Sequence, residues 1–192
     1  MTIDELQARV TLKTNYWDTK KACEILFPIL KPGARVVNVS SARGFLRHLE
    51  NATNKAKAEE NMKILASEDL TVEQLDGLMR NFEMAAIAGN HEEDWNNSAY
   101  SVSKIGLSAL SRIQHRELAK DTSRPDIVLN HVHPGYVDTD MTSHKGHLTI
   151  DRGAEAIVYA SLLPEGTPIR GAYLWHDCQV LDWVTGPLPA AY

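Results

Sequence analysis

This sequence has few cysteines, no long apolar run and no excess of basic residues. Its only cysteines, Cys23 and Cys178, provide neither a disulfide framework nor the spacing of a zinc site, and such sparse usage is typical of a reducing compartment. No apolar run approaches the length of a membrane span, and the N-terminus has neither the basic flank nor the apolar stretch of a signal peptide. We therefore expect a cytoplasmic protein with no membrane partner.

The charge balance excludes another class of partner. The net charge of −5 gives no basic footprint for nucleic acid, so we expect no nucleic-acid partner. The apolar and charged fractions, 43% and 23%, are those of an ordinary globular protein, and 192 residues suffice for one domain with a core. We predict a single domain over residues 1–192, with a loose tail at 186–192.

Glycine-rich motifs are also missing. The 11 glycines are scattered, and no two of them form a G-x-G pair. The sequence therefore contains no Gly-rich turn of the kind whose backbone N–H groups bind a dinucleotide pyrophosphate. It also contains no G-x-S-x-G, which argues against a serine hydrolase.

The sequence does contain an alternation of helix and strand patterns. The β-branched run "RVVNVSS" (35–41) predicts a strand buried on both faces, and "PDIVLNHVHPG" (125–135) and "GAYLWHD" (171–177) predict two more. Helices are expected from about residue 2 to 30, from 71 to 89, from about 98 to 120 and from 151 to 163. The expected helix starts are Thr2 with Glu5, Thr71 with Gln74, and Asp151, and the expected ends are Gly89 and Pro164. This order predicts an α/β fold with a parallel sheet covered by helices on both faces.

Tyr100 and Lys104 stand four residues apart in a run of small and apolar residues, "NNSAYSVSKIGLSALSR" (96–112). On a helix this spacing places the phenol and the ammonium on one face, one turn apart. A cation within about 4–6 Å favours the phenolate and lowers the pKa of a tyrosine, so the pair would suit proton transfer to a carbonyl oxygen that is gaining charge. The alternative is a surface tyrosine and a surface lysine, because Tyr-x-x-x-Lys also occurs by chance.

Polar residues follow two of the predicted strands. Ser40 and Ser41 end the first strand, and "HPGYVDTDM" (133–141) ends the second. The carboxyl ends of parallel strands are where ligands bind in open α/β sheets, and a serine there can donate a hydrogen bond to a substrate carbonyl. Three separate features thus converge on one edge of the sheet, which favours the catalytic interpretation of Tyr100 and Lys104.

In these segments the sequence resembles the short-chain dehydrogenase/reductases, and within them the monomeric carbonyl reductases. The matching segments are "LQARVTLKTNYWDT", "ILKPGARVVNVSS", "WNNSAYSVSKIGLSALSR", "LNHVHPGYVDTDM" and "GAEAIVYASLLP". The resemblance implies the C-terminal part of a doubly wound, Rossmann-like parallel sheet with helices on both faces. It also implies an NADPH-dependent oxidoreductase that reduces small-molecule aldehydes, ketones or quinones to alcohols.

The resemblance assigns roles to individual residues. Tyr100 would protonate the carbonyl oxygen, and Lys104 would lower its pKa and hold the nicotinamide ribose. Ser41 would orient the substrate carbonyl, and Asn15 would hold a water that links Lys104 to solvent. The residues expected to contact the cofactor are Tyr100, Lys104, Pro134, Gly135, Val137, Asp138 and Thr139. Those expected on the substrate side are Ser41, Trp95, Tyr136 and Gln7, and the alternative for Trp95 is a structural anchor.

Residues 44–97 separate the first strand from Tyr100 and are polar and mostly helical in pattern. The carbonyl-reductase branch carries a helical insertion at this place that covers the usual dimer surface, so the resemblance implies a monomer. The alternative interpretation of the segment is a flexible lid.

The sequence departs from the family pattern at its start. The family fold begins with a strand and a Gly-rich turn, and the match starts only after the fourth strand, which leaves roughly 90 residues without a counterpart. We therefore predict an incomplete Rossmann-like domain in which the strand at Arg35 is an apolar sheet edge that recruits a partner or aggregates. Two hypotheses follow: an NADPH-dependent carbonyl reductase, or a truncated and inactive homologue that acts as a binding or decoy protein.

His131 and His133 point the same way along the second predicted strand, which makes them candidate metal ligands. No third ligand is spaced to complete a site, and histidines at a strand end are commonly packed in the core instead. We therefore predict no metal site.

Overall fold

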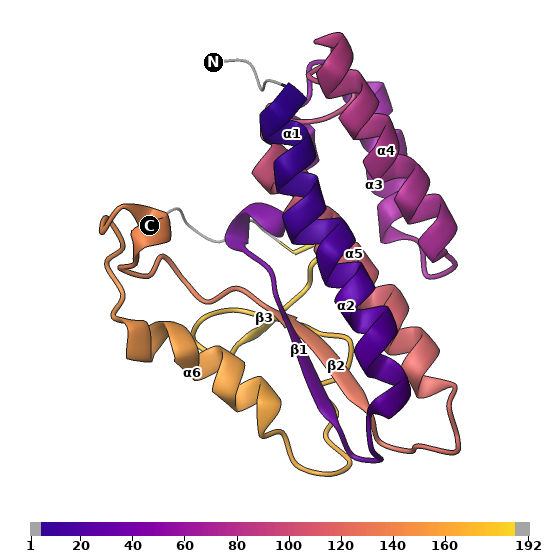
Figure 1. The fold of residues 1–192 in the computed structure, drawn as a ribbon, viewed down its shortest axis with the longest axis vertical. Helices are drawn as coiled ribbons and strands as arrows, with labels where there is room; N and C mark the ends of the chain where they lie inside the picture. The colour runs from indigo at the N-terminus through magenta and orange to yellow at the C-terminus, as the bar shows by residue number, and fades with distance from the viewer. Residues whose placement is uncertain (1–4, 187–192) are drawn as a thin grey trace. The chain divides into compact units, whose positions relative to one another are not determined.

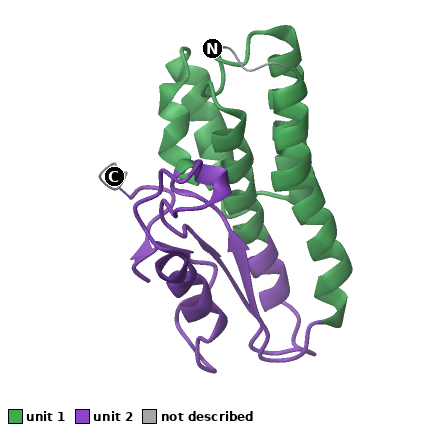
Figure 2. Cartoon of the chain, turned by 60° about the vertical axis from the view of Figure 1, so that its left-hand side comes forward, with its two compact units in different colours: residues 1–29, 43–113 green, residues 30–42, 114–192 purple. Residues whose placement is uncertain are grey.

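The computed structural model describes residues 5–186 of the chain (Figure 1). Two compact units make up the chain (Figure 2). The first unit comprises Met1–Ile29 and Arg43–Ile113, and the second comprises Leu30–Ala42 and Gln114–Tyr192. The described residues contain no helix that is both long enough and apolar enough to cross a membrane.

A long helical stretch begins the first unit. Helices α1 (Glu5–Leu12) and α2 (Asp18–Leu26) are joined by a π-helical turn, η1 (Lys13–Trp17), and a 3₁₀ turn follows at Phe27–Ile29. The predicted helix from about residue 2 to 30 is thus confirmed over the described residues, although the sequence did not predict the π-turn. The expected capping box at Thr2 lies outside the described residues.

Residues 44–97 are an ordered helical segment, as predicted. It contains a 3₁₀ stretch (Leu46–Asn51), α3 (Lys55–Ala66) and α4 (Val72–Ala88). Both hydrogen bonds of the predicted capping box are present, since the Gln74 N–H donates to Thr71 Oγ1 and the Thr71 N–H donates to Gln74 Oε1. Gly89 ends α4 with a φ of +75°, as the sequence predicts.

Helix α5 (Ala99–Ala119) follows the predicted range of about 98 to 120 closely. Its inward face is built from apolar and small side chains, and Val102, Ile105 and Ala109 are all buried. The helix begins one residue before Tyr100, and Tyr100 and Lys104 therefore lie in its first two turns.

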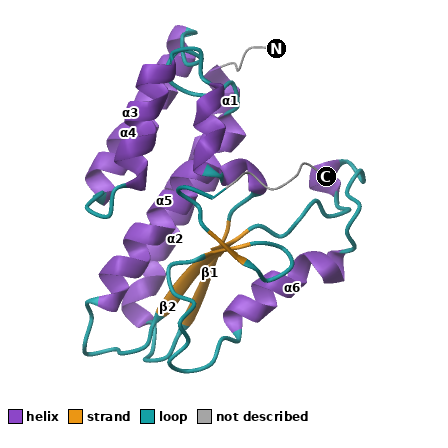
Figure 3. Ribbon diagram, turned by 180° about the vertical axis from the view of Figure 1, so that it is seen from behind, coloured by secondary structure: helices purple, strands orange, loops and turns teal. Residues whose placement is uncertain are grey.

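The second unit contains a four-stranded sheet in the order β1-β2-β3-β4, of which Figure 3 labels β1 and β2. Strand β1 (Arg35–Val39) pairs in parallel with β2 (Val128–Val132) along its whole length, and β2 pairs in parallel with β3 (Tyr173–Leu174). The three predicted strands are confirmed, but the prediction that β1 is buried on both faces is wrong, because only Asn38 of its five residues is buried, whereas all five residues of β2 are. Strand β4 (Val180–Leu181) is an antiparallel return that the sequence did not predict, because its two residues are too few to show a period.

Helices cover both faces of β1 and β2. Helix α6 (Ile150–Ser161) buries Ala156 and Ala160 against Val132, and Val37 packs against the same cluster. On the opposite face of β1, the Asn38 amide donates to Gln114 Oε1 from the last turns of α5. The predicted α/β fold with helices on both sides of a mainly parallel sheet is therefore confirmed.

One predicted helix start is wrong. The N-cap of α6 is Thr149, whose side chain accepts a hydrogen bond from the Arg152 N–H. Asp151 lies inside the first turn instead, where its negative charge still favours the positive end of the helix dipole. Aspartate and threonine both favour helix starts, so the sequence alone did not separate the two positions.

Strand β1 is an edge strand within the described sheet, because β2 is its only neighbour there. Its first residue, Arg35, donates a hydrogen bond at 2.9 Å to the carboxylate of Asp126, which lies two residues before β2. Hydrogen bonds from Arg35 and Arg170 lower the pKa of Asp126 to about 2, so the Asp126 carboxylate stays negatively charged well into acidic solution. Recruitment of a partner or aggregation at the β1 edge stays a prediction.

Candidate functional site

Tyr100 and Lys104 lie one turn apart on α5, with the Lys104 Nζ 5.8 Å from the centroid of the Tyr100 ring. Tyr100 is exposed, whereas Lys104 is partly buried. Burial lowers the pKa of Lys104 from 10.5 to about 8, because removing an ammonium from water disfavours its charged form. The pair therefore combines an accessible phenol with a cation whose charge can be lost near neutral pH.

Asn15 reaches the same turn of α5 from the π-turn of the first unit. Its side-chain amide donates to Ser103 Oγ at 3.0 Å, and Ser103 Oγ donates to the backbone oxygen of Tyr100 at 2.8 Å. Three of the four predicted catalytic residues, Asn15, Tyr100 and Lys104, thus gather around one turn of α5. Ser103 was missed, although its place between Tyr100 and Lys104 in the sequence was a usable signal.

Ser41, the fourth predicted catalytic residue, belongs to the second unit and follows β1 directly. The Ser40 N–H donates to the Val132 oxygen at 2.8 Å and so continues the ladder with β2. The backbone carbonyl oxygen of Ser41 accepts a hydrogen bond from the Tyr173 hydroxyl at 2.8 Å. These bonds fix the backbone that carries the Ser41 side chain at the carboxyl end of β1, where the sequence predicted it.

The predicted cofactor segment 134–139 follows β2 in the second unit. Its first turn contains Gly135 with a φ of +91°, a conformation that favours glycine. Val137 forms a parallel β-bridge with Leu148, and the Asp138 N–H donates to the Leu148 oxygen at 2.9 Å. The segment is therefore the first half of a closed loop, 136–148, at the carboxyl end of β2.

Gly146 permits this loop to close, and its replacement gives a testable prediction. A Cβ at Gly146 would overlap the backbone carbonyl carbon of Val137 and the nitrogen of Asp138, which cannot rotate away as a side chain could. We expect Gly146→Ala to lower the free energy of unfolding by about 1–3 kcal/mol, measured by urea denaturation.

The matched control for this prediction is Gly77→Ala. Gly77 is an exposed position on α4 where a Cβ would meet nothing within 4 Å. We expect this control to raise the free energy of unfolding by up to about 1 kcal/mol, because alanine favours a helix interior over glycine. Equal effects of the two substitutions would contradict the close approach at Gly146.

The residues predicted on the substrate side lie in different surroundings. Tyr136 is exposed in the loop after β2, and Gln7 is exposed on α1. Trp95 is fully buried in the first unit, where its Nε1–H donates to Asn81 and its ring meets Phe82 edge-on at 5.8 Å. These contacts favour the alternative of a structural anchor, and the assignment of Trp95 to a substrate pocket stays a prediction.

His131 and His133 are both buried in the second unit. The His131 ring lies 5.0 Å from that of Tyr173, and the His133 ring lies 4.3 Å from that of Trp175. Burial, with a smaller effect of His176, lowers the pKa of His133 to about 3, so its ring is neutral at physiological pH. Within residues 5–186, no three His, Cys, Asp or Glu side chains are grouped as metal ligands would be.

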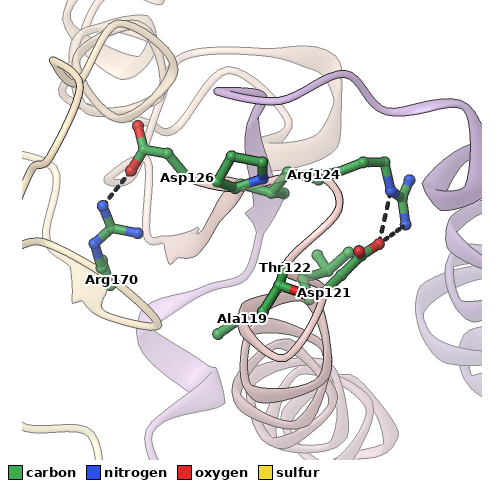
Figure 4. A pocket seen from close by; sticks show the side chains of 9 residues that line it. Ala119, Asp121, Thr122, Arg124, Asp126 and Arg170 are labelled. Carbon is green, nitrogen blue, oxygen red and sulfur yellow. Dashed lines mark hydrogen bonds and ion pairs between the residues drawn. The ribbon is translucent and has the colours of Figure 1, made fainter.

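A pocket of about 270 Å³ lies at the other end of β2 (Figure 4). Its charged side chains pair with one another, Arg124 with Asp121 and Arg170 with Asp126. The pocket borders the residues just before β2, whereas the predicted cofactor segment follows β2. None of the predicted site residues lines it.

The chain is similar in sequence to known proteins over most of its length. Residues 83–148 match the family described as short chain dehydrogenase. Carbonyl reductase [NADPH] 1 of Rattus norvegicus is 42% identical over 179 residues, which are 93% of this chain and 62% of the relative. Carbonyl reductase [NADPH] 3 of the same species is 41% identical over 93% of this chain and 63% of its own length. The chain thus spans about three fifths of the length of these curated relatives.

Solved structures show the same likeness. Salutaridine reductase from Papaver somniferum superposes with a TM-score of 0.76 at 30% sequence identity, over 93% of this chain and 57% of that one. Menthone neomenthol reductase from Mentha piperita superposes with a TM-score of 0.67 at 30% identity, over 90% of this chain and 52% of that one. The resemblance inferred from the sequence motifs is confirmed.

Proposed function

We propose that the chain, which is similar to short-chain dehydrogenase/reductases over most of its length, is an NADPH-dependent oxidoreductase that reduces small-molecule aldehydes, ketones or quinones to alcohols. The observation that carries this proposal is the arrangement on α5. Tyr100 and Lys104 face each other, Ser103 ties Asn15 to the same turn, and burial lowers the pKa of Lys104 to about 8.

The residues present would suit the nicotinamide end of NADPH. Lys104 and Tyr100 offer donors suited to ribose hydroxyl groups, and the loop residues Pro134, Gly135 and 137–139 would lie along the nicotinamide by the family resemblance. NADPH supplies a hydride when it is bound. The pyrophosphate end has no matching Gly-rich turn among these 192 residues, so the donors named here account for only the nicotinamide half.

The proposed chemistry of this chain's own residues is proton transfer at a carbonyl oxygen. The Tyr100 hydroxyl donates its proton as that oxygen gains negative charge, and the Lys104 ammonium stabilises the phenolate that remains. By the family resemblance, Ser41 would donate a second hydrogen bond to the carbonyl oxygen. Asn15 would hold a water that returns a proton to Lys104 from solvent.

A direct test is titration of the purified full chain with NADPH, followed by the fluorescence of the nicotinamide. We expect binding at micromolar concentration and turnover of a small quinone. Binding that is absent at millimolar NADPH would contradict the reductase proposal for this chain. That result would leave the alternative of an inactive binding or decoy homologue, which the comparisons do not favour because each of these relatives is named a reductase.

A further inference from the structure

The π-turn that carries Asn15 is an unusual piece of backbone. Residues 13–17 insert a wider turn between two regular helices, and the backbone angles on both sides stay helical, with φ and ψ near −66° and −41° at Leu12 and −69° and −37° at Asp18. A π-turn is less favourable than the α-helix that surrounds it, so it persists where side-chain contacts hold it. The contacts of the neighbouring residues therefore decide where Asn15 lies.

Asp76 of α4 bonds one residue inside this turn, Tyr16, and one on α2 just after it, Lys20. The Tyr16 hydroxyl donates to Asp76 Oδ1 at 2.8 Å, and the Lys20 ammonium lies 2.5 Å from Asp76 Oδ2. Asp76 is only 8% exposed, and Tyr16 is fully buried. A buried carboxylate is costly unless it is paired, so the two bonds to Asp76 form a coupled unit. Burial, with the bond to Asp76, raises the pKa of Tyr16, which keeps the phenol a hydrogen-bond donor.

Further contacts bring the same turn against α5. A Cβ at Gly106 would lie 3.3 Å from Tyr16 Cδ2 and 2.5 Å from Met79 Sδ, so both α4 and the π-turn approach α5 at this glycine. Gly106 is two residues after Lys104. Next to Tyr16, the Trp17 ring is covered by the Arg80 guanidinium of α4, 5.4 Å from the ring centroid. Helix α4 therefore contacts the turn at both Tyr16 and Trp17.

We propose that Asp76 is a positioning residue that sets the place of Asn15 through Tyr16 and Lys20. The helical segment 44–97 thereby acts on the site, because its helix α4 holds the π-turn whose Asn15 amide bonds Ser103 between Tyr100 and Lys104. Asp76 itself does not touch the reacting atoms. This inference rests on the proposed function only for the chemical role of Asn15, and the positioning itself is independent of turnover.

The test compares Tyr16→Phe with Glu83→Gln in the ¹⁵N-labelled full chain. Tyr16→Phe keeps the buried ring and removes only the hydrogen bond to Asp76. Glu83→Gln is the matched control, because the Glu83 carboxylate also joins α4 to the first helix, through Arg9 at 3.7 Å, but lies away from the π-turn. The readouts are the NMR position of the Asn15 side-chain amide, assigned with Asn15→Ala, and the kinetics of quinone reduction.

We expect Tyr16→Phe to shift the Asn15 amide resonance and to lower kcat by about 10–100-fold with an unchanged KM for the quinone, because a small misplacement costs rate rather than binding. Glu83→Gln should change neither. An Asn15 resonance that stays in place in Tyr16→Phe would overturn the proposal and leave Asp76 a purely structural role. If Tyr16→Phe does not fold, Lys20→Met applies the same test to the other bond, and Asp76→Asn applies it to both bonds at once. A chain without turnover contradicts the proposed function alone, since the resonance still reports on positioning.

Discussion

Tyr100→Phe is expected to lower kcat for carbonyl reduction by about 10²–10⁴-fold, the range that a positioned proton donor contributes. The substitution removes one oxygen from an exposed side chain on α5 and leaves the ring and its contact with the Lys104 ammonium in place. The fold should therefore change little, and the affinity for NADPH should fall by about tenfold at most, the effect of one lost hydrogen bond to the ribose. A loss of rate much larger than the loss of binding would identify the hydroxyl as the chemical group.

The measurement is steady-state turnover of a small quinone beside an NADPH titration for each variant. Tyr159→Phe is the matched control, because Tyr159 is similarly exposed, at 41% against 37% for Tyr100, and lies on α6 of the second unit. We expect the control to keep the activity of the unchanged chain. Wild-type turnover in Tyr100→Phe would remove Tyr100 from the mechanism and favour the interpretation of a surface tyrosine and lysine.

Local patterns in the sequence predicted most of the regular structure. The capping box at Thr71 and Gln74 and the end at Gly89 were predictable because helix caps depend on neighbouring residues alone. Strand β1 was predictable from its β-branched run, but its burial was not, because β1 lies at the edge of the described sheet and only Asn38 is buried. Strand β4 and the π-turn were missed because a two-residue strand has no period and the π-turn depends on contacts with α4.

In the candidate site, too, the residues that lie close together in the sequence were predictable and the distant pairs were not. Tyr100 and Lys104 were predictable because their spacing of four fixes them on one helix face. The bond from Asn15 to Ser103 spans 88 residues, and the bond from Tyr16 to Asp76 spans 60. Spacing along the chain gives no information on such pairs. Asp76 has no feature in the sequence that distinguishes it from a surface carboxylate, because its burial depends on the packing of α4 against the first helices.

Lys104→Met is expected to remove activity while it stabilises the fold. The pKa of Lys104 falls from 10.5 to about 8 on folding, because burial disfavours the ammonium. Below pH 8 the folded chain keeps this charge at a cost of up to about 3 kcal/mol, and a methionine of similar shape would not carry it. We expect the free energy of unfolding at pH 7 to rise and kcat to fall by at least about 10²-fold.

The pH dependence of stability separates this cause from a simple gain in packing. Between pH 8 and 10.5 the unfolded chain binds a proton at Lys104 that the folded chain has lost, so the free energy of unfolding rises with pH across this window. In Lys104→Met this rise should disappear, as followed by urea denaturation at several pH values. Lys63→Met is the control, since Lys63 is 74% exposed and pairs with Glu59 on the surface of α3. A rise that persists in Lys104→Met would show that another group titrates on folding. Its loss, together with the loss of turnover, would show that the chain retains a destabilising charge where proton transfer requires one.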